Sequence, residues 1–204
     1  MIVALMTFIS SLILIVLATT KPKKAPLKFM EIITLPQLRQ TFNYDCGAKA
    51  LQTVLVYYDL EVREDKIIQG ANTDHTGTPI AGIIKFAQKH GLQVDSRSMT
   101  IADLKKYIDR KIPIILPLQA YPIKPVADWR NHWRDGHYVV VIDYTARKII
   151  FEDPSSFERT YLTYRELNDR WHDQDAQGKK YYQHGIALYG LKPKFKPLKI
   201  KHLD

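Results

Sequence analysis

Cys46 is the only cysteine in the sequence of 204 residues, and its surroundings make it a candidate nucleophile. After Gly47, apolar residues recur at the spacing of one helix face: Leu51, Val54, Leu55 and Tyr58. A thiol at the N-terminus of a helix meets the positive end of the helix dipole, which favours the reactive thiolate. A lone cysteine forms no internal disulfide, so Cys46 is either a small apolar core residue or a reactive group.

A cysteine nucleophile needs a base, and the sequence favours His137 over the other histidines. His137 precedes one strand-like apolar run, 138–144, and Asp153 follows a second, 148–152. In an antiparallel hairpin, the residue before the first strand lies opposite the residue after the second. We therefore expect His137 and Asp153 to lie side by side. The carboxylate would then orient the imidazole, whose other nitrogen would face the sulfur.

Three residues near Cys46 bear on how it would react. Gln40, six positions upstream, can join the backbone N–H of Cys46 in stabilising the oxyanion that forms when sulfur attacks a carbonyl. Gly47 would let the backbone approach a substrate carbonyl closely. Asp45 adds a neighbouring negative charge, which opposes the thiolate.

The elements that must position these residues are helices in the first half of the chain and strands after them, which predicts an α+β fold. The expected helices are 47–58, 63–69, one that starts at Thr78-Pro79 and stops at Gly91, 101–110, and one opened by Thr163 and Glu166. The Thr78 hydroxyl would cap the third of these, with Pro79 as its first residue, and Thr100 with Asp103 resembles the capping box that Thr163 forms with Glu166. Besides the hairpin, 186–189 predicts a strand. Pro113 and Pro117 favour an edge or irregular strand over 112–118, and 119–136 predicts a long loop.

Composition and charge favour a folded domain. Hydrophobic residues make up 46% and charged residues 25% of the sequence, which is typical of globular proteins. The net charge is +9, but lysines concentrate at the two ends, and no basic stripe with aromatic residues lies between them. We expect no nucleic-acid partner. The histidine and acidic residues match no defined set of metal ligands, so we expect neither a metal nor another cofactor.

The chain divides into four predicted segments. Residues 1–20 are apolar and predict a membrane anchor or a cleaved signal; 21–34 form a basic linker; 35–190 form the catalytic domain; 191–204 form a basic tail. Lys21, Lys23 and Lys24 would keep the domain of an anchored protein in the cytoplasm. The protein is thus expected to be membrane-anchored by one N-terminal segment or exported, and the side of the membrane stays open.

Taken together, the motif residues resemble those of the double-glycine-leader peptidases, papain-like domains best known from bacteriocin-exporting ABC transporters. The residues that carry the resemblance are Gln40, Cys46-Gly47, His137 and Asp153-Pro154. The resemblance extends over roughly 35–189 and implies a papain-like fold that cuts peptides after a small pair such as Gly-Gly. It implies these roles: nucleophile for Cys46, base for His137, its partner for Asp153, and oxyanion donor for Gln40.

No transporter segment or nucleotide-binding domain follows in this sequence, so the chain is similar to stand-alone members, and a separate ABC exporter is a possible partner. The expected activity is that of a cysteine peptidase acting on a peptide or protein through a thioester acyl-enzyme. Two alternatives remain. One is an amidase or acyltransferase acting on cell-wall or other amides; the other is a module that binds leader peptides without cutting them.

Overall fold

The computed structural model describes residues 33–198 together with residues 200 and 202. The predicted anchor or signal, 1–20, and most of the predicted linker lie outside the described residues. Five α-helices are described: α1 (Cys46–Tyr57), α2 (Glu64–Gly70), α3 (Ile80–Lys89), α4 (Ile101–Asp109) and α5 (Tyr164–Arg170). Within this part of the chain, every helix is too short or too polar to cross a membrane.

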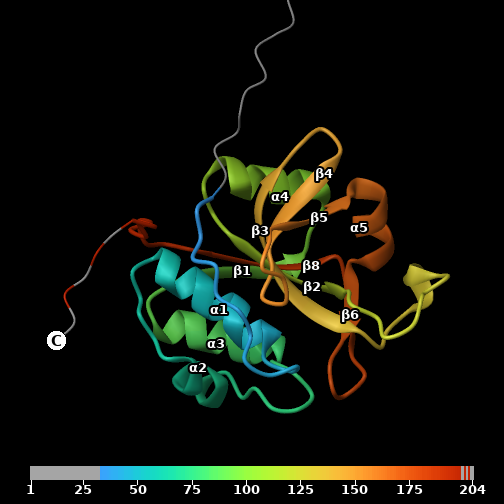
Figure 1. The fold of residues 1–204 in the computed structure, drawn as a ribbon, viewed down its shortest axis with the longest axis horizontal. Helices are drawn as coiled ribbons and strands as arrows, with labels where there is room; N and C mark the ends of the chain where they lie inside the picture. Colours follow the sequence, from blue (N-terminus) through green and yellow to red (C-terminus); the bar gives the residue numbers. More distant parts are fainter. Residues whose placement is uncertain (1–32, 199, 201, 203–204) are drawn as a thin grey trace, which may run out of the picture.

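An antiparallel sheet forms the other half of the fold, with strand order β1-β8-β2-β3-β4-β5. Its strands are β1 (Gln93–Ser98), β2 (Ile114–Gln119), β3 (Gly136–Tyr144), β4 (Lys148–Glu152), β5 (Thr160–Thr163) and β8 (His184–Tyr189). A separate hairpin pairs β6 (His172–Gln174) with β7 (Lys180–Tyr182). Helices α1 to α3 gather on one side of the molecule, and α4 and α5 lie beside the sheet (Figure 1). The predicted α+β class is confirmed.

The helices form for reasons that are visible in the sequence. Leu51, Val54 and Leu55 of α1 are fully buried, as their spacing predicts, and α1 packs against β3. Both expected capping boxes are present. In α4, the Thr100 hydroxyl accepts a hydrogen bond from the backbone N–H of Asp103, and in α5 Thr163 accepts one from Glu166.

The start of α3 differs from its prediction. Pro79 is the N-cap residue and not the first helical residue, and no side chain caps this helix. The Thr78 hydroxyl is instead hydrogen-bonded to the hydroxyl of Thr73 at 2.9 Å. The hydroxyl that was expected to cap α3 therefore links two residues of the loop before this helix.

The prediction that 112–118 forms an edge strand was wrong. β2 is buried along its whole length and lies between β8 and β3. It tolerates Pro117 because its pairing with β8 ends at Ile115, so Pro117 has only one neighbouring strand, β3. Pro113 precedes the strand.

The hairpin of β3 and β4 forms with a register that differs from the expected one. Val140 pairs with Glu152 and Tyr144 with Ile149, and the register shifts at a β-bulge between Val141 and Asp143. Continuing the register beyond Glu152 would place residue 153 opposite residue 139, two positions from the predicted partner. A diagonal neighbour at this separation is still within reach of a long side chain.

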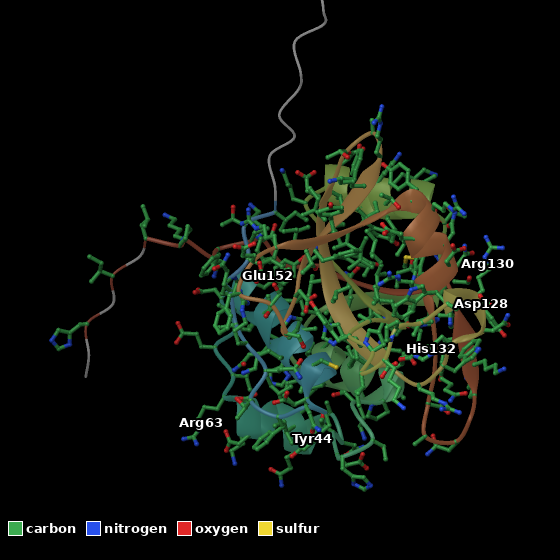
Figure 2. The ribbon with its side chains drawn as sticks, turned by 45° about the vertical axis from the view of Figure 1, so that its right-hand side comes forward. Tyr44, Arg63, Asp128, Arg130, His132 and Glu152 are labelled. Carbon is green, nitrogen blue, oxygen red and sulfur yellow. The ribbon has the colours of Figure 1, made fainter. Side chains whose placement is uncertain are left out.

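The predicted loop between β2 and β3 is present and contains one short 3-10 helix, Trp129–Asn131. Figure 2 shows Asp128, Arg130 and His132 on this loop, on the opposite side of the molecule from Glu152. The chain returns from the loop directly into Gly136 and His137 at the start of β3. The loop therefore leaves and re-enters the sheet next to the candidate base.

Part of the predicted basic tail contacts the domain. The backbone N–H groups of Lys194 and Phe195 donate hydrogen bonds to the carbonyl of Tyr57, at 3.0 and 3.2 Å. The Phe195 side chain packs against the core. The chain after β8 thus returns to the C-terminal end of α1.

Candidate active site

His137 lies between Asp153 and Cys46. Its Nε2 atom is 2.8 Å from Oδ1 of Asp153, and the Cys46 thiol lies near enough to interact with the same imidazole. Because Nε2 faces the carboxylate, Nδ1 is the nitrogen left for the sulfur. All three residues are buried, with exposed fractions of 5% for His137, 2% for Asp153 and 7% for Cys46. The structure therefore brings together three of the four residues that the sequence singles out, from α1, β3 and the end of β4.

The electrostatics of this group favour an imidazolium. Burial opposes a charge on His137, but the hydrogen bonds with Asp153 and Cys46 outweigh it and raise the pKa of the imidazole to about 9. Burial also opposes the charge on Asp153, yet its hydrogen bonds, first that with His137, lower the pKa of the carboxyl. Both pKa shifts favour the charged forms, so that the His137 imidazolium and the Asp153 carboxylate form one buried ion pair. A positive ring beside the sulfur is the environment that a reactive thiolate requires.

Cys46 is the first residue of α1, as predicted, and Gly47 after it is closely packed by its neighbours. A Cβ atom on Gly47 would lie 2.7 Å from Cβ of Thr78 and 2.9 Å from Cδ2 of Tyr138. Glycine is therefore needed because two side chains pack against the helix beside Cys46. Close approach of a substrate is not required to explain it.

Asp45 is the N-cap residue of α1, directly before Cys46. The residue is fully buried, and burial together with a hydrogen bond to Glu64 raises the pKa of its carboxyl, which favours the neutral form. Of these two acids, Glu64 favours the charged form. Burial raises the pKa of its carboxyl, but its hydrogen bonds, led by that from Lys49 at 2.8 Å, outweigh burial and lower the pKa. Asp45 also accepts a hydrogen bond from the N–H of Thr41. Its structural role is to hold the loop before α1.

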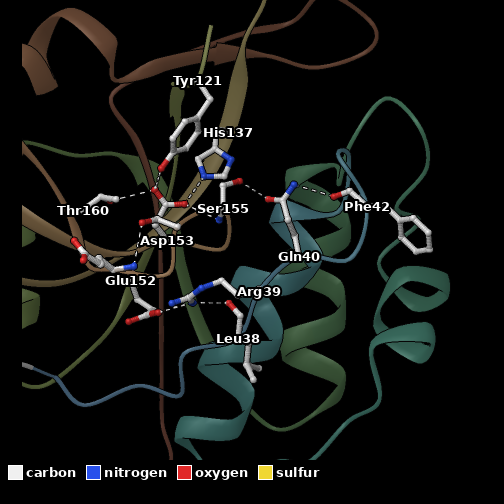
Figure 3. A network of polar contacts seen from close by, with 12 residues as sticks. Leu38, Arg39, Gln40, Phe42, Tyr121, His137, Glu152, Asp153, Ser155 and Thr160 are labelled. Carbon is white, nitrogen blue, oxygen red and sulfur yellow. Dashed lines mark hydrogen bonds and ion pairs between the residues drawn. The ribbon is translucent and has the colours of Figure 1, made fainter. Parts of the chain in front are cut away.

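Gln40 lies in the same polar network (Figure 3), and the hydrogen bonds of its amide go to Phe42 and Ser155 rather than to Cys46 or His137. Its Oε1 atom accepts a hydrogen bond of 2.7 Å from Ser155, and its Nε2 atom donates one of 2.8 Å to the carbonyl of Phe42. Ser155 in turn donates its N–H to Asp153 at 2.9 Å. These contacts fix the amide orientation, and one of the two Nε2 hydrogens is left for another acceptor.

A cavity of about 580 Å³ opens at Cys46. One wall is the loop before α3, from Asn72 to Pro79, and the other is the β6–β7 hairpin. Tyr138 lies deep in it, where its hydroxyl donates to the carbonyl of Thr78 at 3.0 Å. A second cavity of about 410 Å³, lined by Tyr121, Trp129 and Asp153, lies on the other side of the His137–Asp153 pair. The thiol is therefore reachable from the first cavity.

The model of the peptidase C39 family matches residues 34–174, which include Cys46, His137 and Asp153. The chain belongs to the peptidase C39 family. This membership places it among the cysteine-type peptidases. It also agrees with the resemblance that the motif residues carry.

Three comparisons illustrate the relationship. The C39 chain is 27% identical over 167 residues to the mesentericin-Y105 transport/processing ATP-binding protein MesD of Leuconostoc mesenteroides; the match covers 80% of this chain and 20% of MesD. The peptidase domain of Streptococcus ComA, a bi-functional ABC transporter, has 24% identity and a TM-score of 0.56, over 76% of this chain and 97% of that domain. A double glycine motif protease from an AMS/PCAT transporter, solved with its leader peptide, has 18% identity and a TM-score of 0.56, over 81% and 96%.

These comparisons set the extent of what is shared. The chain spans only one fifth of the length of MesD, so the likeness concerns one domain of that protein. The two solved domains are nearly covered, and they confirm the papain-like fold of this C39 chain.

Tyr121 is a residue of the C39 site that sequence reasoning missed. Its hydroxyl donates a hydrogen bond of 2.7 Å to Oδ2 of Asp153, and its ring meets the His137 ring edge to face, with centroids 5.2 Å apart (Figure 3). Its backbone has φ of +55°, which a non-glycine residue adopts at a cost. Tyr121 lies in the loop after β2, where no periodic pattern marks it.

The change Tyr121→Phe tests this contact. The variant keeps the ring over His137 but removes a hydrogen bond to a charged carboxylate, so we expect kcat/KM to fall about 10-fold. Without this donor the pKa of Asp153 rises, and the acid limb of the pH profile moves to higher pH. Tyr161→Phe is the control, because Tyr161 is equally exposed and its hydroxyl makes no hydrogen bond within the described residues. Equal activity of the two variants would contradict the assignment.

Proposed function

We propose that the protein hydrolyses a peptide bond through a thioester acyl-enzyme formed on Cys46. The observation that carries the proposal is the contact of one buried imidazole, His137, with both the Cys46 thiol and the Asp153 carboxylate. A nucleophile, a base and a group that orients the base form the arrangement that acyl transfer requires. The cavity at Cys46 gives a peptide access to the sulfur.

The proposed reaction has two halves. In the first, the thiolate of Cys46 attacks the carbonyl carbon, the bond from carbon to nitrogen breaks, and the His137 imidazolium gives its proton to the departing amine. In the second, His137 takes a proton from water, the hydroxide adds to the thioester, and the bond from carbon to sulfur breaks. The products are an acid and the restored thiol. Asp153 holds the ring and stabilises its charged form throughout.

The proposed oxyanion donors are the backbone N–H of Cys46 and the side-chain amide of Gln40. The amide has one hydrogen left after its bond to the carbonyl of Phe42, and Ser155 holds its oxygen on the opposite side. Losing one donor of this kind costs about 3 to 4 kcal/mol in the transition state. Because Ser155 also contacts Asp153, Gln40 and the His137–Asp153 pair are held by a common group.

For the substrate we propose a peptide with a Gly-Gly pair before the scissile bond. Tyr138 and Thr78 crowd the start of α1 and line the cavity beside Cys46, which favours residues without large side chains there. Further support is the AMS/PCAT protease, solved with its leader peptide. A separate ABC exporter is the proposed partner, since MesD is both a transport and a processing protein. Contact with a membrane through 1–20 is part of the same proposal.

The test uses synthetic peptides that contain one Gly-Gly pair and matched peptides in which Val-Val replaces it. We expect products that end in a glycine carboxylate, identified by mass spectrometry, and cleavage of the Val-Val peptides at least about 10-fold slower. Equal cleavage of both sets would reject the Gly-Gly specificity. Hydrolysis of cell-wall amides, with all peptides left intact, would instead favour the amidase.

A further inference from the structure

The β6–β7 hairpin brings a carboxylate to the cavity that opens at Cys46. Asp173, Asp175 and Tyr181 of this hairpin line the cavity. Asp173 is half-buried and lies against Gly136, the residue before the proposed base. A Cβ atom on Gly136 would be 2.6 and 2.8 Å from the two carboxylate oxygens, so glycine at this position leaves the room that the carboxylate occupies.

One oxygen of Asp173 is fixed and the other is unpaired. Oδ1 accepts hydrogen bonds from Nε2 of Gln119 at 3.0 Å and from the N–H of Gln174 at 2.9 Å. Gln119 is itself fully buried, and its Oε1 accepts the N–H of Asp135 at 3.0 Å. Within the described part of the chain, Oδ2 of Asp173 has no hydrogen bond and no ion pair. These hydrogen bonds thus fix the position of the Asp173 carboxylate and leave Oδ2 free to accept a hydrogen bond from a ligand.

The other two carboxylates of the cavity, those of Asp74 and Asp175, accept hydrogen bonds from residues of their own turns. Asp74 is exposed to solvent, and its Oδ1 accepts the N–H and hydroxyl of Thr76. Asp175 accepts the N–H of Lys179 at 2.9 Å and the hydroxyl of Tyr181 at 3.2 Å. The basic residues lining the cavity are Arg134 and His75, and neither forms an ion pair with Asp173 within the described residues. Asp173 is therefore the carboxylate of this cavity that is placed for a ligand.

We propose that Asp173 is a specificity-determining residue that binds a cationic side chain of the substrate, lysine or arginine, in the cleft beside Cys46. The inference rests on the proposed function, since it takes the ligand to be a peptide. A partly dehydrated carboxylate with a free oxygen gains more from a cation than a carboxylate in water does, because the surroundings screen the pair less. An uncharged side chain of the same length has no such attraction to the Asp173 carboxylate.

The protonation of Asp173 supports a second readout. Burial raises the pKa of its carboxyl to about 6, against the hydrogen bonds of Gln174 and Gln119 and the nearby charge of His137, which lower it; Asp175 adds to the increase. The carboxyl is therefore ionised above about pH 6 and neutral below it. A preference for cations should accordingly fade as the pH drops through this value.

The experiment measures kcat/KM for internally quenched Gly-Gly peptides in which each flanking position in turn holds lysine or norleucine. At one position we expect lysine to exceed norleucine at least about 10-fold. Asp173→Asn should remove this preference, so that the lysine and norleucine peptides are cleaved with equal kcat/KM. Asp169→Asn, which removes a carboxylate of α5 that pairs with Arg130 outside the cleft, should retain it. No lysine preference, or the same preference in Asp173→Asn, would overturn the proposal.

Binding separates this proposal from the proposed function. The Kd values of the same peptides are measured with a Cys46→Ala protein, which needs no turnover. A lysine preference that depends on Asp173, found without cleavage by the unaltered protein, would support the site while rejecting the peptidase activity. Cleavage by the unaltered protein without a lysine preference would support the peptidase activity and reject the site. If Asp173→Asn fails to fold, the ratio of lysine to norleucine in the unaltered protein decides: it should fall below about pH 6, and a constant ratio contradicts the assignment.

Discussion

Replacing Cys46 with alanine is expected to lower kcat at least about 10⁴-fold, because the Cys46 thiol is the nucleophile that interacts with His137. The unaltered protein should also react with iodoacetamide near pH 6 faster than free cysteine does. At this pH the His137 imidazole is charged, since its pKa is about 9, and the positive ring favours the thiolate. Turnover is measured with the Gly-Gly peptides and labelling by intact mass.

Cys46→Ser provides the matched variant, since it keeps a side chain of similar size that cannot form a comparable anion at neutral pH. It should be as inactive as Cys46→Ala, while thermal unfolding shows that both variants remain folded. Retained turnover in Cys46→Ala would mean that the activity does not arise at this site. Labelling no faster than that of free cysteine would mean that the imidazolium does not act on the sulfur.

The second large effect is expected for Asp153→Asn, which should lower kcat about 10⁴-fold. The Asp153 carboxylate accepts hydrogen bonds from His137, Tyr121, Thr160 and the N–H of Ser155. An amide at this position turns an N–H group toward some of these donors and favours the wrong tautomer of His137. The pKa of the imidazole also falls, because burial opposes its charge once the anion is gone.

The sign of this pH effect can be tested without a substrate. The imidazolium of the unaltered protein persists up to about pH 9, and that of Asp153→Asn is lost at a lower pH. Iodoacetamide should therefore label Cys46 more slowly in the variant between about pH 7 and pH 8. Asp109→Asn is the control, since this carboxylate accepts a hydrogen bond from Tyr144 at the surface. Equal labelling of the unaltered protein and Asp153→Asn would show that Asp153 does not hold the charge on His137.

Local patterns account for the parts of the fold that the sequence predicts. The spacing of Leu51, Val54 and Leu55 defines α1, and this places Cys46 at its N-terminus. Thr100 and Thr163 open helices by contacts within one turn. The proximity of His137 and Asp153 also follows from a hairpin, although the β-bulge shifts the register and a diagonal contact replaces the direct one.

The pairings between distant strands were not predicted. β1 is mostly polar, and it forms because β8, far along the chain, pairs with it. β2 reaches the interior of the sheet through the same partner, which no local pattern reveals. β5, β6 and β7 are short, so an alternating pattern has no length in which to appear.

The contacts of Tyr121 and Asp173 were missed for a related reason. Both residues lie in or next to connections whose paths are set by the elements they join. Their types alone fit an ordinary exposed loop or turn. Only the folded chain shows that one hydroxyl reaches Asp153 and that one carboxylate faces the cavity at Cys46.

The chain of hydrogen bonds from Gln40 through Ser155 to Asp153 has a consequence for how the protein matures. It links the segment ahead of α1 with the turn that follows β4, and these two regions are more than a hundred residues apart. A chain in which these regions have not packed together has the Cys46 thiol but lacks the His137 imidazole and the Asp153 carboxylate beside it. The sulfur therefore meets its imidazole and carboxylate only when the segment before α1 and the turn after β4 have packed together.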